Sequence, residues 1–221
     1  QMIDAGLPNL VIEKIANDNT NLAKYYRAAF EAYFEKKWDV SINNFLKIIE
    51  IADLKSDLTK NAYIKIAEVY SIIEKYDDAL KYYKYFLDTF KNYQNMAIIY
   101  HNIGAVYQNK KDFENAKIFF EKALENNNKL AESHIGLINY FIIKKDYNTA
   151  LEKYKQALRL MPQNVELNYN YGYLIFNYIM DNKRLETEMQ TAFDNTIKFA
   201  QPTDARQLNM LQKAAAYNYL L

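Results

Sequence analysis

Apolar residues recur along most of the chain at the three- and four-residue spacing of an α-helix. In the clearest stretch, Tyr100, Ile103 and Tyr107 form one such face, and the polar residues 108–112 interrupt it. A second apolar face follows at Phe113, Ala116, Phe120 and Ala123. The pattern predicts two helices joined by a short polar turn.

The same two-helix pattern returns 34 residues further along the chain, which indicates an internal repeat. Size-matched residues at this shift are Tyr107 with Phe141, Phe113 with Tyr147, Ala116 with Ala150, Phe120 with Tyr154 and Ala123 with Ala157. Gly104 and Gly172 lie two such shifts apart, in the interior of predicted helices. We expect the missing side chains to let a neighbouring helix approach closely.

The composition supports a purely helical chain. Its 221 residues include only 4 Gly and 3 Pro, too few to supply the tight turns of a sheet protein of this length. Helices need few residues of either type. We therefore predict an all-α fold.

The repeat resembles the tetratricopeptide repeat, whose pattern alternates small and large residues at fixed positions. The unit beginning at Ala97 supplies Tyr100, Ile103, Gly104, Tyr107, Ala116, Phe120 and Ala123 at those positions. The unit beginning at Ala131 supplies Leu137, Phe141, Ala150, Tyr154, Ala157 and Pro162, and it departs from the pattern at His134 and Ile138. The resemblance implies a right-handed superhelix of antiparallel helix pairs, an α-solenoid.

The repeat pattern also suggests how the chain is organised. We expect a helical lead-in over residues 1–21 and about five helix pairs over residues 22–200, beginning near 22, 60, 97, 131 and 165. The last pair is degenerate, with its second helix delayed to roughly residues 185–200. A capping helix is expected over residues 201–221, entered at Pro202 and Thr203.

Little in the sequence favours catalysis or a bound cofactor. The chain has no Cys, and its two His residues have no cluster of further ligands at metal-binding spacing. No phosphate-binding loop or nucleophile motif is present. The net charge of +1 lacks the concentrated basic face that nucleic-acid binding needs, and no stretch is apolar enough to span a membrane. We expect no enzyme, cofactor, metal, nucleic acid or membrane span.

In the resembled family, the first helix of each pair lines a concave groove and contacts the ligand from a few set positions. Carrying those positions over gives the candidate partner-binding residues Tyr26, Phe30, Tyr33, Asn61, Glu68, His101, Asn102, Gln108, Asn139, Tyr169 and Tyr173. The same positions also include Phe34 and Lys65. Amides that can pair with a peptide backbone and rigid aromatic rings both suit a neutral or mixed peptide or helix.

The leading hypothesis is a non-catalytic scaffold that binds a peptide or helix of a partner protein. The acidic C-terminal tail of chaperones is not expected to bind, because its clamp needs Lys and Asn where the second unit has Ile64 and Glu68. The alternative is a structural or assembly component that self-associates or packs on other domains of a cell-envelope or multiprotein complex. A carbohydrate-binding outer-membrane protein and an enzyme are further classes. A bacterial cytoplasmic and an exported, periplasmic location both stay open.

Overall fold

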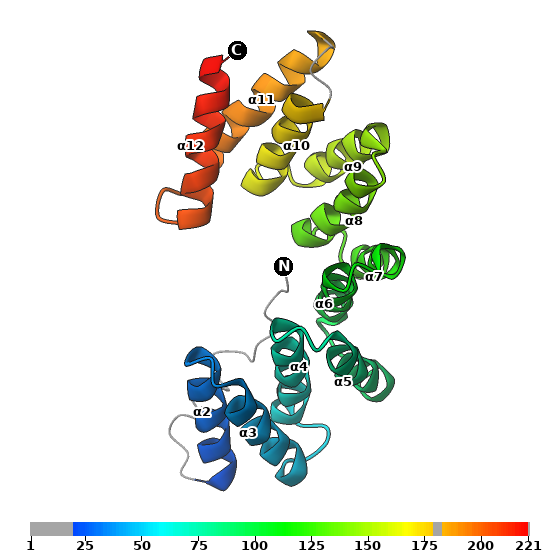
Figure 1. The fold of residues 1–221 in the computed structure, drawn as a ribbon, viewed down its shortest axis with the longest axis vertical. Coiled ribbons are helices and arrows are strands. Elements are labelled where there is room, and N and C mark those ends of the chain that lie inside the picture. Colours follow the sequence, from blue (N-terminus) through cyan, green and yellow to red (C-terminus); the bar gives the residue numbers. More distant parts are fainter. Residues whose placement is uncertain (1–19, 179–182, 221) are drawn as a thin grey trace. The chain divides into compact units, whose positions relative to one another are not determined.

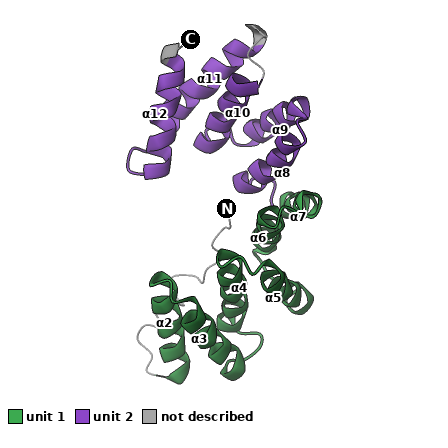
Figure 2. Ribbon diagram, in the orientation of Figure 1, with its two compact units in different colours: residues 1–126 green, residues 127–221 purple. Residues whose placement is uncertain are grey.

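The computed structural model describes residues 20–178 and 183–220, and every regular element in these ranges is an α-helix (Figure 1). The predicted all-α fold is therefore confirmed. The predicted lead-in lies, up to residue 19, outside the described residues. The chain divides into two compact units, residues 1–126 and residues 127–221, which are coloured separately in Figure 2.

The described residues of unit 1 form three successive helix pairs. Its helices are α2 (Asn21–Phe34), α3 (Trp38–Ile51), α4 (Asp57–Ile72), α5 (Tyr76–Thr89), α6 (Met96–Asn109) and α7 (Phe113–Asn126). Each even-numbered helix packs against the helix that follows it, and α3 and α5 each contact the next pair. The result is a stack of antiparallel hairpins within the unit (Figure 1).

Within its described residues, unit 2 has two helix pairs of the same kind and one added helix. Its helices are α8 (Ala131–Ile143), α9 (Tyr147–Leu160), α10 (Val165–Tyr178), α11 (Lys183–Phe199) and α12 (Ala205–Leu220). The helix α12 packs on both members of the preceding pair, α10 and α11. Each unit by itself is built from tetratricopeptide-like antiparallel helix pairs, as the sequence predicts.

Each second helix buries at least one large aromatic side chain, at a matching place in the five pairs. These residues are Phe45, Tyr83, Phe120, Tyr154 and Phe193. Small residues make room for them: a Cβ built on Gly104 would lie 2.8 Å from ring atoms of Phe120. The close approach of paired helices thus depends on a small residue facing a ring.

The turns inside the first four pairs share one backbone conformation. Lys36, Glu74, Lys111 and Lys145 have positive φ values of 58°, 62°, 64° and 60°. In each turn the next residue donates its backbone N–H to a carbonyl five residues earlier, as Lys37 does to Ala32 at 2.8 Å and Asp112 to Tyr107 at 2.9 Å. This is the Schellman arrangement, in which the left-handed residue is usually Gly.

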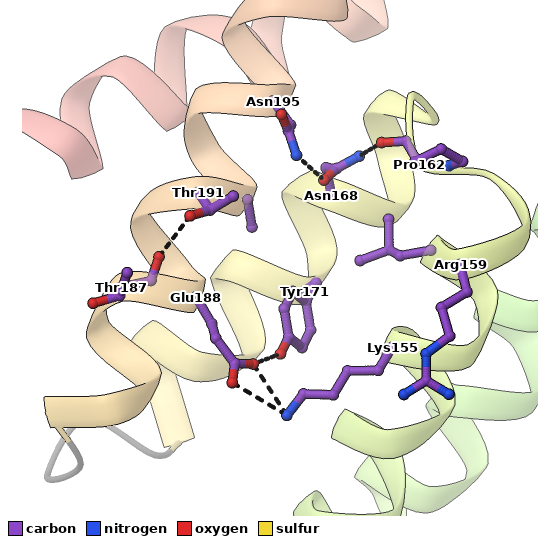
Figure 3. Close-up of a pocket in the computed structure, with 11 residues that line it drawn as sticks. Lys155, Arg159, Pro162, Asn168, Tyr171, Thr187, Glu188, Thr191 and Asn195 are labelled. Carbon is purple, nitrogen blue, oxygen red and sulfur yellow. Dashed lines mark hydrogen bonds and ion pairs between the residues drawn. The ribbon is translucent and has the colours of Figure 1, made fainter.

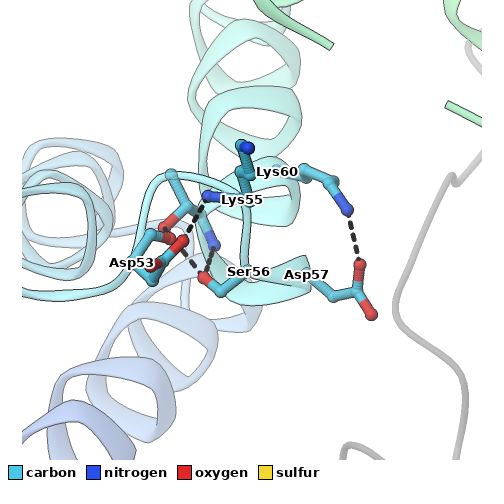
Figure 4. A network of polar contacts seen from close by, with 6 residues as sticks. Asp53, Lys55, Ser56, Asp57 and Lys60 are labelled. Atoms are coloured by element: carbon cyan, nitrogen blue, oxygen red, sulfur yellow. Dashed lines mark hydrogen bonds and ion pairs between the residues drawn. The ribbon is translucent and has the colours of Figure 1, made fainter. Parts of the chain in front are cut away.

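The start of α4 is fixed by a polar network in the loop before it (Figure 4). The Ser56 hydroxyl accepts the backbone N–H of Thr59 at 3.2 Å and so caps the helix. The Thr59 hydroxyl donates to the carbonyl of Asp53 at 2.7 Å, and the Asp53 carboxylate accepts the N–H of Lys55. The network fixes the first turn of α4, and Asn61 follows directly after that turn.

Candidate functional site

The first helix of unit 1 carries a row of aromatic rings. Tyr26 and Phe30 have ring centroids 4.7 Å apart, and Phe30 packs edge-on against Phe45 of α3 at 5.3 Å. The row continues to Phe34, whose ring lies 6.3 Å from that of Phe30. Tyr26 is buried, whereas Phe34 is 76% exposed. The row therefore runs from the core of unit 1 out to solvent.

The neighbouring helix α4 places an ion pair beside these rings. The Lys65 ammonium lies 2.8 Å from a carboxylate oxygen of Glu68, and both side chains are only 5% exposed. The same ammonium stands 5.6 Å from the ring centroid of Tyr33 and 6.0 Å from that of Phe30. Ring faces attract a cation at this range, so α2 and α4 together hold the Lys65 charge.

Asn61, one turn before Lys65, is 2% exposed. Neither its amide nitrogen nor its amide oxygen has a hydrogen-bond partner among the residues that the structure describes. The buried hydroxyl of Ser71, at the other end of α4, also has no hydrogen-bond partner among the described residues. A buried polar group without a partner costs about 1–3 kcal/mol and calls for an explanation.

The third first-helix, α6, adds two buried polar residues. His101 is buried with its ring 5.4 Å from that of Phe120, and Asn102 is also buried and hydrogen-bonds the Tyr83 hydroxyl. Burial raises the pKa of Tyr83 well above its usual value, the charge of Glu68 adds to the rise, and the Asn102 bond opposes it. Tyr83 is thus a neutral link between α4 and α6.

We call these residues of α2, α4 and α6 the unit 1 face: Tyr26, Phe30, Tyr33, Phe34, Asn61, Lys65, Glu68, His101 and Asn102. The structure brings together seven of the predicted partner-binding residues on this face. Gln108 stands apart from them, half-buried near the C-terminal end of α6. The face combines a buried polar floor with an exposed aromatic end.

The other predicted residues belong to unit 2. Asn139 is half-buried on α8, and Tyr169 and Tyr173 lie on α10 with ring centroids 6.0 Å apart. Burial raises the pKa of Tyr169 to about 12. Tyr217 of α12 packs against Tyr173 at 6.2 Å, so the added helix covers part of this α10 surface.

Tyr217 is the contact that sequence reasoning missed. Its ring also lies 4.6 Å from that of Phe176 and 5.1 Å from that of Phe193. The apolar ending of the sequence motivates an expectation of self-association, but Tyr217 is engaged inside unit 2. The i, i+3 spacing of Ala214 and Tyr217, one face of the predicted capping helix, is the sequence signal that could have revealed this packing.

The described residues contain no group of three or more His, Asp or Glu side chains that could hold a metal ion. None of the helices within the described ranges is long and apolar enough to cross a membrane.

Comparison with known proteins identifies the repeats. Family models of the tetratricopeptide repeat match residues 97–130 and residues 139–177. No curated protein matches the chain in sequence.

Several solved structures share the fold at low sequence identity. The protein MamA is 16% identical with a TM-score of 0.59, over 89% of this chain and 94% of its own. YrrB, described as a TPR protein with an unusual peptide-binding site, is 18% identical with a TM-score of 0.56, over 93% and 97%. A thermophilic TPR protein of Thermus thermophilus is 18% identical with a TM-score of 0.59, over 90% and 100%.

Proposed function

Because the chain is a tetratricopeptide repeat protein, a kind that typically serves as a non-catalytic scaffold for protein–protein interaction, we propose that the unit 1 face binds a peptide or helix of a partner protein. The scaffold acts by holding this segment, with no chemical turnover. The segment lies along α4, between the aromatic row of α2 and the amide of Asn102 on α6.

The buried, unpaired amide of Asn61 is the observation that carries the proposal. Its side chain offers one acceptor and two donors, and none of them is used within the described residues. An extended peptide presents a carbonyl and an N–H at matching spacing along its backbone. A peptide group placed at Asn61 would satisfy both atoms and recover the free energy that the unpaired amide costs.

The remainder of the unit 1 face suggests what the segment looks like. Lys65 and Glu68 neutralise one another, so the floor carries no net charge and favours a neutral or mixed sequence over an acidic one. Phe34, exposed at the end of the aromatic row, offers an anchor for an apolar side chain. Because the floor is already fixed by packing, little side-chain freedom is lost on binding.

The test is selection of peptides from a random displayed library on the whole chain, followed by affinity measurements. We expect Phe34→Ala to weaken binding of the selected peptides by roughly tenfold or more, because anchor residues commonly contribute over 1.4 kcal/mol. Asn61→Ala should weaken it to a similar degree. An amidated variant of the best peptide checks that binding does not depend on a free terminus.

The matched control is Ile118→Ala, which trims a 46% exposed apolar residue on the second helix α7. This variant should keep full affinity. An acidic C-terminal peptide should bind no better than a scrambled sequence. Unchanged affinity in both Phe34→Ala and Asn61→Ala would show that the partner binds elsewhere.

A further inference from the structure

A second site lies within unit 2, in a pocket of about 480 Å³ between α9, α10 and α11 (Figure 3). Lys155 and Arg159 of α9 form one wall, and Glu188 and Thr191 of α11 form the other. The volume falls within the range of about 300–1,000 Å³ typical of small-ligand pockets.

The floor of the pocket comes from α10 and is held rigidly. Asn168 donates from its amide nitrogen to the carbonyls of Pro162 at 2.9 Å and Asn164 at 2.8 Å, and its oxygen accepts from Asn195 at 3.2 Å. At the other end, the Tyr171 hydroxyl donates to the Glu188 carboxylate. Both ends are therefore polar, and their geometry is already fixed.

The charges in the pocket do not cancel. The Lys155 ammonium reaches from α9 to α11 and lies 3.1 Å from Glu188, so these two charges compensate each other. Arg159, one turn further along α9, is exposed and forms no ion pair with any described residue. Lys155 also lies 3.8 Å from Glu152, which does not line the pocket. Among the lining residues one positive charge therefore remains, carried by the Arg159 guanidinium.

Part of the pocket lining is apolar. Leu158, Pro162 and Ala192 contribute to it. A guanidinium pairs with a carboxylate through two parallel hydrogen bonds, a geometry that an ammonium cannot offer. The pocket thus combines a guanidinium that can bind one carboxylate through two hydrogen bonds with an apolar lining that can hold a short apolar group.

We propose that this pocket binds a carboxylate attached to an apolar group, with Arg159 as the residue that pairs with the carboxylate. The ligand is either a small free acid or the C-terminal residue of a peptide, since both present the same chemistry.

This site is separate from the surface of α10 that the family positions assign to the partner. The pocket uses Asn168 and Tyr171, which stand on one side of α10, whereas Tyr169 and Tyr173 stand on another and meet α12. The inference therefore goes beyond the proposed function and does not depend on the unit 1 face.

The experiment is a titration of the whole chain with N-acetylleucine and with its neutral amide, followed by backbone amide chemical shifts. We expect shifts confined to α9, α10 and α11, and roughly 10- to 100-fold tighter binding of the acid, as hydrogen bonds to a charged group provide. Arg159→Gln should remove this preference. Arg159→Lys, which keeps the charge but loses the fork, should retain only part of it.

Lys153→Gln is the matched control, because it removes a positive charge from the same helix without lining the pocket. It should leave the preference for the acid intact. A hexapeptide ending in a free Leu carboxylate distinguishes the sources: tighter binding than N-acetylleucine points to a peptide terminus, and equal binding points to a free acid. Equal affinity for acid and amide, insensitivity to Arg159→Gln, or no shifts with any probe would overturn the proposal.

Discussion

Gly104 faces the ring of Phe120 so closely that a Cβ on the glycine would stand 2.8 Å from Cδ1 and Cε1 of the ring. Gly172 has the same relationship with Phe193, where the nearest ring atom would be 2.8 Å away. Real Cβ atoms are not found at such distances from a ring. In both units the first and second helices of a pair therefore meet where a side chain is missing.

Replacing Gly104 by Leu should lower the stability of unit 1. The added side chain would push Phe120 off its position against α6, at a cost of roughly 1–3 kcal/mol for overpacking. Thermal unfolding followed by circular dichroism should show a melting temperature several degrees lower. Gln156→Leu, which adds the same side chain at an exposed position on α9, should melt as the unaltered chain does.

The Gly–Phe contacts also show how far the sequence predicts the fold. In the middle pairs each position of the 34-residue unit has one packing role. Comparing the sequence with itself at a shift of 34 residues therefore identifies the residues that pack together in each pair. The fifth pair breaks this register because Phe193 stands 21 residues after Gly172, whereas Phe120 stands 16 after Gly104. The sequence pattern predicts a delayed second helix there, but it does not identify the residue that meets Gly172.

The candidate site was less predictable than the fold. Family positions indicate which residues point away from the core of a pair, and in the structure Lys65 lies beside both Phe30 and Glu68. They do not say how deeply a residue is buried, which depends on the size of its neighbours. His101 and Asn102 are buried for that reason, beside Phe120 and Tyr83.

Two buried asparagines should respond in opposite ways to replacement by Leu. Asn61→Leu removes an amide that has no described partner, so the free energy of unfolding should rise by about 1–3 kcal/mol while peptide binding is lost. Asn168→Leu leaves the carbonyl of Pro162 without its donor and removes the side-chain bond to the carbonyl of Asn164, which keeps only the backbone N–H of residue 168. The free energy of unfolding should therefore fall by a similar amount. Urea unfolding of both variants measures the change in the free energy of unfolding. A destabilised Asn61→Leu variant would mean that the Asn61 amide of the unaltered chain has a partner in solution.

Breaking the Lys65–Glu68 pair should be costly. Glu68→Gln leaves the Lys65 charge buried without its carboxylate partner, and breaking a buried pair in this way typically costs about 3–5 kcal/mol. The double change Lys65→Met and Glu68→Leu should cost much less, because no charge stays buried. Glu50→Gln breaks the exposed pair with Lys47 and should cost at most about 1 kcal/mol. Urea unfolding compares the three, and equal effects of Glu68→Gln and Glu50→Gln would argue against a buried charge.

His134 should make stability fall in mildly acidic solution. Burial lowers the pKa of His134 below its ordinary value of 6.5, and the hydrogen bond with the Asn128 carbonyl opposes this only in part. The unfolded chain therefore binds the proton first, so stability is full above pH 6.5 and declines as the pH falls toward the lowered pKa. Proton NMR should give a pKa below 6.5, and His134→Gln should reduce the loss of stability between neutral and mildly acidic pH.

The four turns with a left-handed residue offer positions at which substitution by Gly should raise the thermal stability of the chain. Lys36, Glu74, Lys111 and Lys145 are exposed, and each holds a backbone conformation that costs a residue with a Cβ about 1–2 kcal/mol and costs Gly little. Changes at four distant turns should add, so a variant with Gly at all four would melt at a higher temperature. None of the four belongs to the unit 1 face or lines the Arg159 pocket. Such a background would tolerate damaging changes at either site, and it would let loss of binding be measured without loss of the fold.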